Sequence, residues 1–231
     1  MNRTRLLRVF TDETGNFGDA ASVVIDEDRH LDERARLALA RKLSTGETAF
    51  INDVESASVS IIHPEGEIDF AGVAALAAAY VLASVRGRPT NVLRARGGAI
   101  KVWRDDSITW VQASLDVLPP WHLTELPAAS DIETVTEAKS AQLQHTMIWA
   151  WMDRSHRVVR ARTFAPDWGI PEAEGNGSGS MKLAAVLGKS VTIIHGAGSL
   201  IYAKPSPNNR AELGGRITEA GELQATVAVS P

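Results

Sequence analysis

The chain has 231 residues, of which 24 are Lys or Arg and 28 are Asp or Glu, so its formal net charge is −4. With 44% hydrophobic and 23% charged residues, the composition is that of a globular protein and excludes the disordered and fibrous classes. The sequence contains no cysteine, which excludes disulfides, thiolate metal sites, iron–sulfur clusters and thiol nucleophiles.

The sequence predicts neither a membrane segment nor a nucleic-acid surface. The longest apolar run, 73–83, is far shorter than the roughly 20 residues that cross a bilayer. The first ten residues lack the apolar core of a signal peptide. The mild acidic balance argues against bulk nucleic-acid binding, which needs a concentrated positive surface. We therefore expect a cytoplasmic protein that binds neither membranes nor nucleic acid.

The first half of the sequence predicts strands separated by turn signals, and two helices. Alternating or β-branched residues indicate the strands, and segments rich in glycine and polar residues indicate the turns. In chain order these elements are strands at 6–10 and 22–25, a helix capped by Asp32 and ending near Leu43, a strand at 57–63, and a short strand, a glycine and an alanine-rich helix within 68–85.

The order of strand, glycine and apolar helix recurs about a hundred residues later. Residues 158–166 predict a strand, 167–179 a glycine-rich loop, and 180–188 an apolar helix that ends at Gly188. A turn cluster at 205–215 then leads into a last strand at 215–229. The repeated order predicts two lobes of similar construction.

The segment 119–136, rich in proline and polar residues, predicts the boundary between these lobes, at 1–118 and 119–231. The last strand is free to return to the N-terminal lobe. We expect an α+β fold in which each lobe has a helix against a curved mixed sheet, with a cleft between the lobes.

Two helix starts that follow glycines, near Gly72-Val73 and Gly177-Ser178, are candidate anion sites. The first N–H groups of a helix lack partners within the helix, and the helix dipole adds positive charge there, so such ends bind carboxylates. Glycines also occur at these turns for backbone reasons alone.

Four stretches carry a family resemblance: VFTDETGNFGDAASVVID, RKLSTGETAFI, IHPEGEIDFAGVAALAAAYVL and RTFAPDWGIPEAEGNGSGSMKLAAVL. They resemble, in the same order, motifs of the phenazine-biosynthesis PhzF-like family, and they span most of the chain. The resemblance implies the two-lobed diaminopimelate epimerase-like fold, with a curved mixed sheet around a central helix in each lobe. It also implies an isomerase that uses neither metal nor cofactor.

The second stretch resembles the segment around the family's acid/base glutamate and so implies that role for Glu47. In the third stretch, Val73 and Ala74 stand where the family has histidine and proline. In the fourth, Ala173 stands where the family has aspartate, whereas Glu172, Gly177 and Ser178 match. Gly18-Asp19-Ala20 stands where the family commonly has Gly-Asn-Pro.

Glu47 is also interpretable without the family. It lies between Gly46 and a strand-like segment, where a carboxylate can project among apolar neighbours such as Phe50, Phe70 and Val73. Removal from water raises the pKa of a carboxyl group towards neutrality, as an acid/base residue requires. The alternative is a surface glutamate at the start of a strand.

Three other polar residues are candidates for substrate binding. Glu174 can replace the missing aspartate, or be an exposed acid of a glycine-rich loop. His195 can supply the polarity lost at Val73, or be a hydrogen-bonded structural histidine. Asp19 is a further candidate, or supports its own turn.

The remaining motifs predict packing or surface roles. His63, His122, His145, His156 and His195 lack the spacing of paired metal ligands, so we expect no metal site. The pairs Arg94/Arg96 and Arg160/Arg162 have strand spacing and are interpreted as solvated strand faces. Trp149 and Trp151 indicate packing.

The resulting hypothesis is a PhzF-like isomerase that moves an allylic or α proton on a small carboxylic or amino acid in a specialised-metabolite pathway such as antibiotic biosynthesis. Two alternatives stay open. One is an epimerase or racemase with a non-cysteine acid/base pair, Glu47 with Glu174. The other is a non-catalytic small-molecule binding protein of the same fold. A homodimer is compatible with each.

Overall fold

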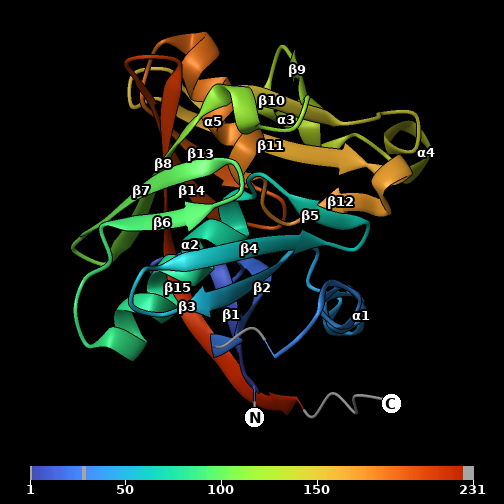
Figure 1. Cartoon of the computed structure of the whole chain (residues 1–231). Helices are drawn as coiled ribbons and strands as arrows, with labels where there is room; N and C mark the ends of the chain where they lie inside the picture. The colour runs from blue at the N-terminus through green and yellow to red at the C-terminus, as the bar shows by residue number, and fades with distance from the viewer. Residues whose placement is uncertain (1, 28–29, 226–231) are drawn as a thin grey trace. The chain divides into compact units, whose positions relative to one another are not determined.

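The computed structural model describes residues 2–27 and 30–225 (Figure 1). The chain forms two compact units. Unit 1 comprises Met1–Val9, Ala20–Ala113 and Ile217–Pro231, and unit 2 comprises Phe10–Asp19 and Ser114–Arg216. The main boundary thus lies after Ala113, whereas the sequence predicted it after residue 118. The chain passes between the units within or at the end of strands β1, β2, β8 and β15.

Unit 1 is built on a mixed sheet with the strand order β1-β2-β3-β4-β6-β7-β8, and β5 pairs with β4. The elements are β1 (Asn2–Thr11), β2 (Asp19–Ile25), α1 (Glu33–Leu43), β3 (Thr48–Asp53), β4 (Ser58–His63), β5 (Gly66–Ile68), α2 (Gly72–Arg86), β6 (Val92–Ala95), β7 (Gly98–Asp105) and β8 (Ile108–Ser114).

Unit 2 is built on strands in the order β15-β14-β13-β11-β10-β9, and β12 pairs with β11. The elements are η2 (Leu115–Val117), β9 (His122–Glu125), α3 (Ala129–Glu133), α4 (Glu137–Ser140), β10 (Thr146–Asp153), β11 (Val158–Ala165), η3 (Pro166–Trp168), β12 (Ile170–Ala173), α5 (Gly177–Leu187), β13 (Val191–His195), β14 (Ser199–Ser206) and β15 (Arg210–Ala225).

The two units repeat one pattern of strand pairing. In unit 1, β2 pairs parallel with β3, β3 antiparallel with β4, β4 parallel with β6, and β6-β7-β8 are antiparallel. In unit 2, β9-β10, β10-β11, β11-β13 and β13-β14-β15 follow the same sequence of directions. In each unit a short strand, β5 or β12, precedes the apolar helix α2 or α5. The predicted α+β fold of two similar units is confirmed.

Helices α2 and α5 form the centre of each unit because they are apolar on nearly every face. Ten of the fifteen residues of α2 are buried, and the helix packs on β3 and β4. In α5 the buried residues include Met181 and Leu183, and the helix packs on β14. A helix that is hydrophobic on all sides is stable only when it is covered on all sides.

Helix α1 begins and ends where the sequence predicts. The side chain of Asp32 accepts a hydrogen bond from the backbone N–H of Ala35, and α1 ends at Leu43. Its apolar face contributes Leu39 to a cluster with Val24, Phe50 and Ile62. An N-cap of this kind stabilises a helix by about 1 kcal/mol.

Several boundaries in unit 2 differ from the predicted ones. Helix α5 begins at Gly177 rather than 180, because the side chain of Asn176 caps it by accepting from the N–H of Gly179. The segment predicted as a loop at 167–179 contains β12, and the turn cluster at 205–215 is shorter because β14 and β15 extend into it. The high glycine and proline content of these segments predicts longer turns than the structure has. Part of the predicted last strand, 226–229, lies outside the described residues.

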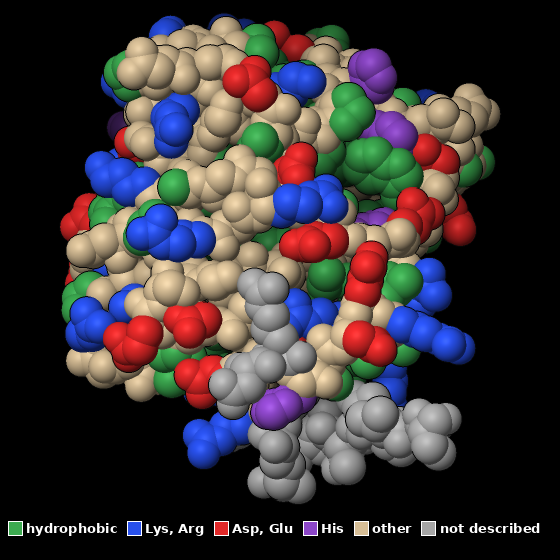
Figure 2. Space-filling model, viewed as in Figure 1, with side chains coloured by type: hydrophobic (Ala, Val, Ile, Leu, Met, Phe, Trp, Pro, Cys, Tyr) green, Lys and Arg blue, Asp and Glu red, His purple; other side chains and the backbone are tan. Residues whose placement is uncertain are grey.

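Surface charges of both signs are interspersed over the face shown in Figure 2. In the part of the chain that the structure describes, no helix is long and apolar enough to cross a membrane.

Candidate active site

Glu47 lies in unit 1 immediately before β3, where the chain leaves the loop that follows α1. Two left-handed residues, Ser44 and Gly46, turn the chain into the strand. The Ser22 hydroxyl is 2.6 Å from the Thr45 hydroxyl and 2.8 Å from that of Thr48. These contacts hold the backbone on both sides of Glu47, so its side chain leaves from a fixed point.

The carboxyl group of Glu47 is in an environment that favours its neutral form. The residue is half-buried, and burial raises its pKa, an effect that its own backbone N–H partly offsets. Within the described residues, no other hydrogen-bond or ion-pair partner holds this carboxyl group. A carboxyl group that is partly removed from water and free of charged partners can accept and return a proton near neutral pH.

Gly72 and Val73 begin helix α2, in the same unit as Glu47 and on a helix that packs against β3. The N-cap residue is Ala71, which provides no side-chain cap. Val73 is only 6% exposed. The first N–H groups of α2 are therefore buried and lack a capping side chain, which leaves the positive helix end available to an anion.

Gly177 and Ser178 begin helix α5 in unit 2, but the Ser178 hydroxyl is already engaged. It accepts a hydrogen bond from the indole N–H of Trp121 at 2.8 Å and donates to Asn176 Oδ1 at 3.2 Å. The same Asn176 oxygen accepts from the N–H of Gly179 at 2.8 Å. The start of α5 is thus fixed by side chains, and the backbone is the part that can bind a substrate.

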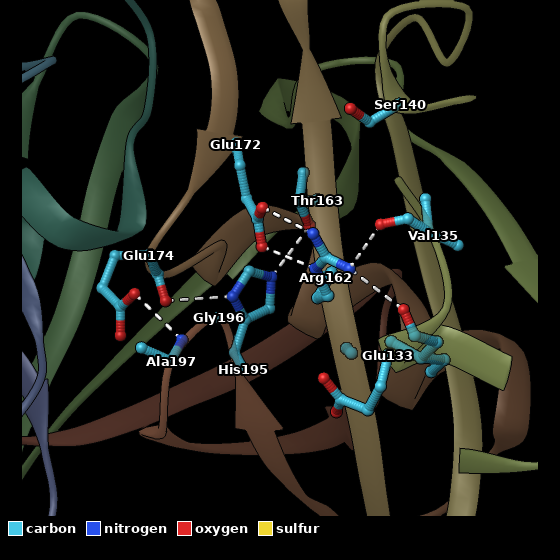
Figure 3. Close-up of polar contacts among 12 residues, drawn as sticks. Glu133, Val135, Ser140, Arg162, Thr163, Glu172, Glu174, His195, Gly196 and Ala197 are labelled. Atoms are coloured by element: carbon cyan, nitrogen blue, oxygen red, sulfur yellow. Dashed lines mark hydrogen bonds and ion pairs between the residues drawn. The ribbon is translucent and has the colours of Figure 1, made fainter. Parts of the chain in front are cut away.

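His195 is completely buried, and both of its ring nitrogens have protein partners (Figure 3). Nδ1 donates to the carbonyl of Glu174 at 3.0 Å, so Nε2, 2.8 Å from the Thr163 hydroxyl, accepts. Asn176 Nδ2 in turn donates to the Thr163 hydroxyl at 3.2 Å. Burial lowers the pKa of His195 to about 4, so the ring is neutral at physiological pH.

Glu174 and Asp19 lie beside this network. The carboxylate of Glu174 accepts from the N–H of Ala197 at 3.0 Å and from the Ser199 hydroxyl at 2.8 Å. That hydroxyl accepts from the N–H of Gly18 at 3.0 Å. Asp19 is adjacent, because a Cβ on Gly175 would lie 3.3 Å from the Cβ of Asp19. Unit 2 therefore brings together the sequence-predicted residues Asp19, Glu174, Gly177, Ser178 and His195.

Arg160 and Arg162 do not form a solvated strand face, which corrects the interpretation from strand spacing. Their side chains are 12% and 16% exposed. Arg162 forms two 2.7 Å bonds to Glu172 and also donates to the carbonyls of Ile132 and Val135 (Figure 3). The Arg162 guanidinium lowers the pKa of Glu172. The Ile132 carbonyl at the C-terminal end of α3 also accepts from the N–H of Val135, and Arg162 uses its second lone pair.

These groups line a hollow of about 680 Å³ in unit 2. Its wall contains three carboxylates and two guanidinium groups, contributed by Glu133, Glu172, Glu174, Arg160 and Arg162, with Val135, Gly196 and Ala197 completing it. Arg160 bonds Glu133 and the carbonyls of Ile194 and Gly196. Protein groups already accept hydrogen bonds from the guanidinium groups of both arginines, so we interpret this hollow as a structural surface.

Trp121, His145 and Asp167 belong to the site region but were not singled out as site residues from the sequence. His145 Nε2 is 2.7 Å from a carboxylate oxygen of Asp167, and the ring lies against Trp168 with centroids 3.6 Å apart. Trp121 contacts both rings edge-on. His145 immediately precedes β10 as Glu47 precedes β3, so the repeat places a titratable residue at the same position in each unit. Aligning GETAF with QHTMI in the sequence would have revealed it.

No group of three His, Asp or Glu side chains is placed to hold a metal ion within residues 2–27 and 30–225.

Comparison with known proteins establishes the family. The model of the family described as phenazine biosynthesis-like protein, PhzC-PhzF, matches residues 7–159. The chain belongs to this family, as its motifs predicted.

Solved structures show the same fold. A phenazine biosynthesis protein of the PhzF family from Enterococcus faecalis is 18% identical, with a TM-score of 0.80 over 98% of this chain and 99% of that one. One from Bacillus anthracis is 14% identical, with a TM-score of 0.74 over 98% and 100%. A hydroxyproline epimerase from Agrobacterium vitis is 14% identical, with a TM-score of 0.58 over 96% and 91%. The fold is therefore diaminopimelate epimerase-like, and family and fold together support an isomerase- or epimerase-type function.

Proposed function

We propose that the protein is an isomerase in which Glu47 removes a proton from a carbon of a small carboxylic or amino acid and returns a proton to that substrate. The observation that carries the proposal is the state of the Glu47 carboxyl group. It is half-buried, its pKa is raised by burial, and its own N–H is its only partner among the described residues. A structural glutamate in such surroundings would be expected to have a cationic or hydrogen-bonding partner.

The uncapped start of α2 supports a carboxylate-bearing substrate. The N–H groups at Gly72 and Val73 lie at the positive end of a fifteen-residue helix. A substrate carboxylate bound there would have its charge neutralised, which makes its α or allylic proton easier to remove. Val73 offers an apolar contact rather than a hydrogen-bond donor, so the adjoining part of the substrate should be apolar.

The proposed reaction needs only proton transfer, and we propose that it proceeds without a metal or a cofactor. A pathway role in specialised metabolism, including antibiotic biosynthesis, stays a prediction from the resemblance. The homodimer also stays a prediction, and sedimentation equilibrium would measure the oligomeric state directly.

The test is proton exchange followed by NMR in deuterated buffer. Candidate substrates are proline, hydroxyproline and β,γ-unsaturated carboxylic acids, because these carry an α or allylic C–H beside a carboxylate. The wild type should exchange one carbon-bound proton of its substrate. Glu47→Gln should slow this exchange about 10²–10⁴-fold, the usual contribution of a general acid/base.

Glu65→Gln is the matched control, since Glu65 is an exposed carboxylate of the same unit and the substitution is the same. This control should exchange protons like the wild type. A Glu47→Gln protein with full exchange activity would refute the proposal, provided that the control is also active.

An epimerase is the second candidate function, favoured by the structural likeness to the hydroxyproline epimerase. It would need a second acid/base residue, for which the sequence offered Glu174. The bonds to Ala197 and Ser199 hold the Glu174 carboxylate in one orientation. Inversion at the α carbon without movement of a double bond, together with loss of exchange in Glu174→Gln, would favour the epimerase over the isomerase.

A binding protein that has lost the reaction is favoured by Val73 and Ala173, which replace polar residues of the family motifs. In that case the acids would bind, as shown by shifts of protein resonances, but no carbon-bound proton would exchange. The same NMR samples therefore distinguish a binding protein from an enzyme that exchanges a carbon-bound proton.

A further inference from the structure

Unit 2 has a second hollow, of about 500 Å³, which shares no lining residue with the hollow beside Arg160 and Arg162. It is formed where the turn between β10 and β11, the end of α5 and the strands β14 and β15 come together. Its lining includes Trp151, Arg154, Arg157, Lys189, Lys204 and Glu212.

The sheet register places the charged members of this lining side by side. The N–H of Thr192 donates to the carbonyl of Arg157 at 3.0 Å, which sets Arg157 beside the start of β13. On the other side of β13, Val191 pairs with Ala203, and Lys204 follows in β14. Lys204 is paired in register with Glu212 of β15. The arrangement is therefore fixed by backbone pairing across four strands.

The end of α5 adds a further cation. Gly188 adopts the left-handed conformation that terminates the helix, with φ of 62°. The next residue is Lys189, whose N–H donates to the carbonyl of Ala184 at 3.3 Å. Because the backbone is fixed on both sides, the side chain of Lys189 leaves from a defined point at the hollow.

The turn that carries the two arginines is also ordered. Asp153 accepts hydrogen bonds from the N–H groups of Ser155 and His156 and from the Ser155 hydroxyl. The guanidinium of Arg154 lies over the ring of Trp151, 5.2 Å from its centre, and donates to Glu125 at 3.2 Å. The rigid turn limits the entropy that ligand binding would cost.

The charge balance of the hollow is strongly positive. Four cations, Arg154, Arg157, Lys189 and Lys204, face a single acid, Glu212. Glu125 partly neutralises Arg154, and Lys204 is paired in register with Glu212. Neither Arg157 nor Lys189 has an ion-pair partner in the described part of the chain. These two cations stand out because the chain as a whole is acidic.

We propose that this hollow is a binding site for a small molecule that carries a phosphate or diphosphate group, with Arg157 and Lys189 as its main ligands. The planar guanidinium of Arg157 can bind two phosphate oxygens at once, and the ammonium of Lys189 provides a compact charge. The hydroxyl of Ser190 adds a neutral donor beside them.

The dimensions favour a small ligand over a macromolecule. A volume of about 500 Å³ is in the range of small-molecule sites, roughly 300–1,000 Å³. A nucleic acid would need a longer positive surface, which the net charge of −4 disfavours. The Arg154 guanidinium already covers one face of the Trp151 ring, so the proposal rests on the phosphate and not on stacking of a base.

The test is a titration of the full chain with inorganic pyrophosphate, followed by calorimetry and by amide NMR shifts. Saturable binding at a single site is expected, with the largest shifts at 188–190 and 154–157, and with weaker affinity at higher ionic strength. The double variant Arg157→Gln/Lys189→Gln should weaken binding by at least about tenfold, because each lost charge-assisted hydrogen bond contributes to affinity.

The control is Arg94→Gln/Lys42→Gln, which removes the same charge from exposed positions in unit 1. It should bind pyrophosphate like the wild type. Equal weakening in both double variants would overturn the proposal, because binding would then follow net charge alone. Absence of saturation, shifts confined to other residues, or tight binding of an acidic peptide or of single-stranded DNA in place of pyrophosphate would also overturn it. Because no catalysis is measured, the result is independent of the role of Glu47.

Discussion

Glu47 is expected to destabilise the folded protein at the pH at which it serves as a base. Burial raises its folded-state pKa above the ordinary value of 4.5 for a glutamate side chain. Between those two pKa values the folded state holds a proton that the unfolded state has released. The stability that this residue contributes is therefore fully present below the pKa of the unfolded state. It is lost as the pH rises through the pKa of the folded state.

We predict that Glu47→Gln raises the stability of the protein at pH 7 to 8 and that the gain shrinks as pH falls towards 4. Glutamine is nearly the same shape but has no charge to desolvate. The check is the free energy of unfolding of both proteins from denaturant titrations across this pH range. A gain that is constant with pH would mean that the Glu47 carboxyl group is not desolvated in the folded state.

His195 acts on stability in the opposite direction. Its pKa is lowered by burial to about 4 in the folded state, against 6.5 for the free side chain. As pH falls from 6.5 to 4, the unfolded chain takes up a proton that the folded chain does not, so stability is lost over this window.

We predict that the wild type loses on the order of 3 kcal/mol through this residue over that window, since each pKa unit corresponds to about 1.4 kcal/mol. His195→Gln, which cannot be protonated, should show a shallower fall in the free energy of unfolding between pH 6.5 and 4. The variant should also be less stable at pH 7, because the bonds to Thr163 and Glu174 are disturbed. Parallel pH slopes in the two proteins would contradict the assignment.

At the scale of elements, the turn between β13 and β14 depends on a glycine. Gly196 has φ of +56°, and a Cβ there would lie 2.6 Å from the carbonyl oxygen of Glu174. Any side chain must therefore displace the segment that His195 and Ala197 hold. Gly188 has nearly the same φ, +62°, but open space around its Cβ position.

We predict that Gly188→Ala costs about 1 kcal/mol of stability, the penalty of the left-handed backbone alone. Gly196→Ala should cost clearly more, because the clash with Glu174 is added to the same backbone penalty. Thermal or denaturant unfolding of the two variants measures the difference. Equal losses would show that the Glu174 segment moves away without cost.

Local signals predicted elements well where the determining contacts are close in sequence. The cap of α1 by Asp32 involves residues three apart, and the apolar run of α2 reports its own burial. The start of α5 was placed three residues late because Gly177, Ser178 and Gly179 suggest a loop. The cap by Asn176 and the bond from Trp121 to Ser178 make these residues helical.

At the scale of the whole molecule, neither unit is formed by one continuous segment of the chain. Residues 10–19 belong to unit 2, although the sequence around them belongs to unit 1, and residues 217–231 return to unit 1. Phe10 is fully buried in unit 2, where a Cβ on Gly175 or Gly215 would meet its ring at 2.8 or 2.5 Å.

We predict that neither 1–113 nor 114–231 folds when it is expressed alone. The second fragment lacks Phe10, and loss of a buried phenylalanine typically costs 3–5 kcal/mol, comparable with the stability of a whole domain. The first fragment lacks the part of β15 that belongs to unit 1. Amide NMR spectra of each fragment and of their mixture test this. A dispersed spectrum from 114–231 alone would contradict it.

The sequence by itself determined the family, the α+β class, the repeat of two similar units and the position of Glu47 at the start of a strand. These follow from patterns within a few residues, such as periodicity, caps and motif order, which act before any tertiary contact forms. The tertiary structure alone decided which polar groups are free. Thr163 and His195 are 32 residues apart, and Trp121 and Ser178 are 57 apart. Such pairings, the burial of Arg160 and Arg162, and the clustering of cations at the end of α5 depend on how strands from distant parts of the chain are brought into register, which no local pattern encodes.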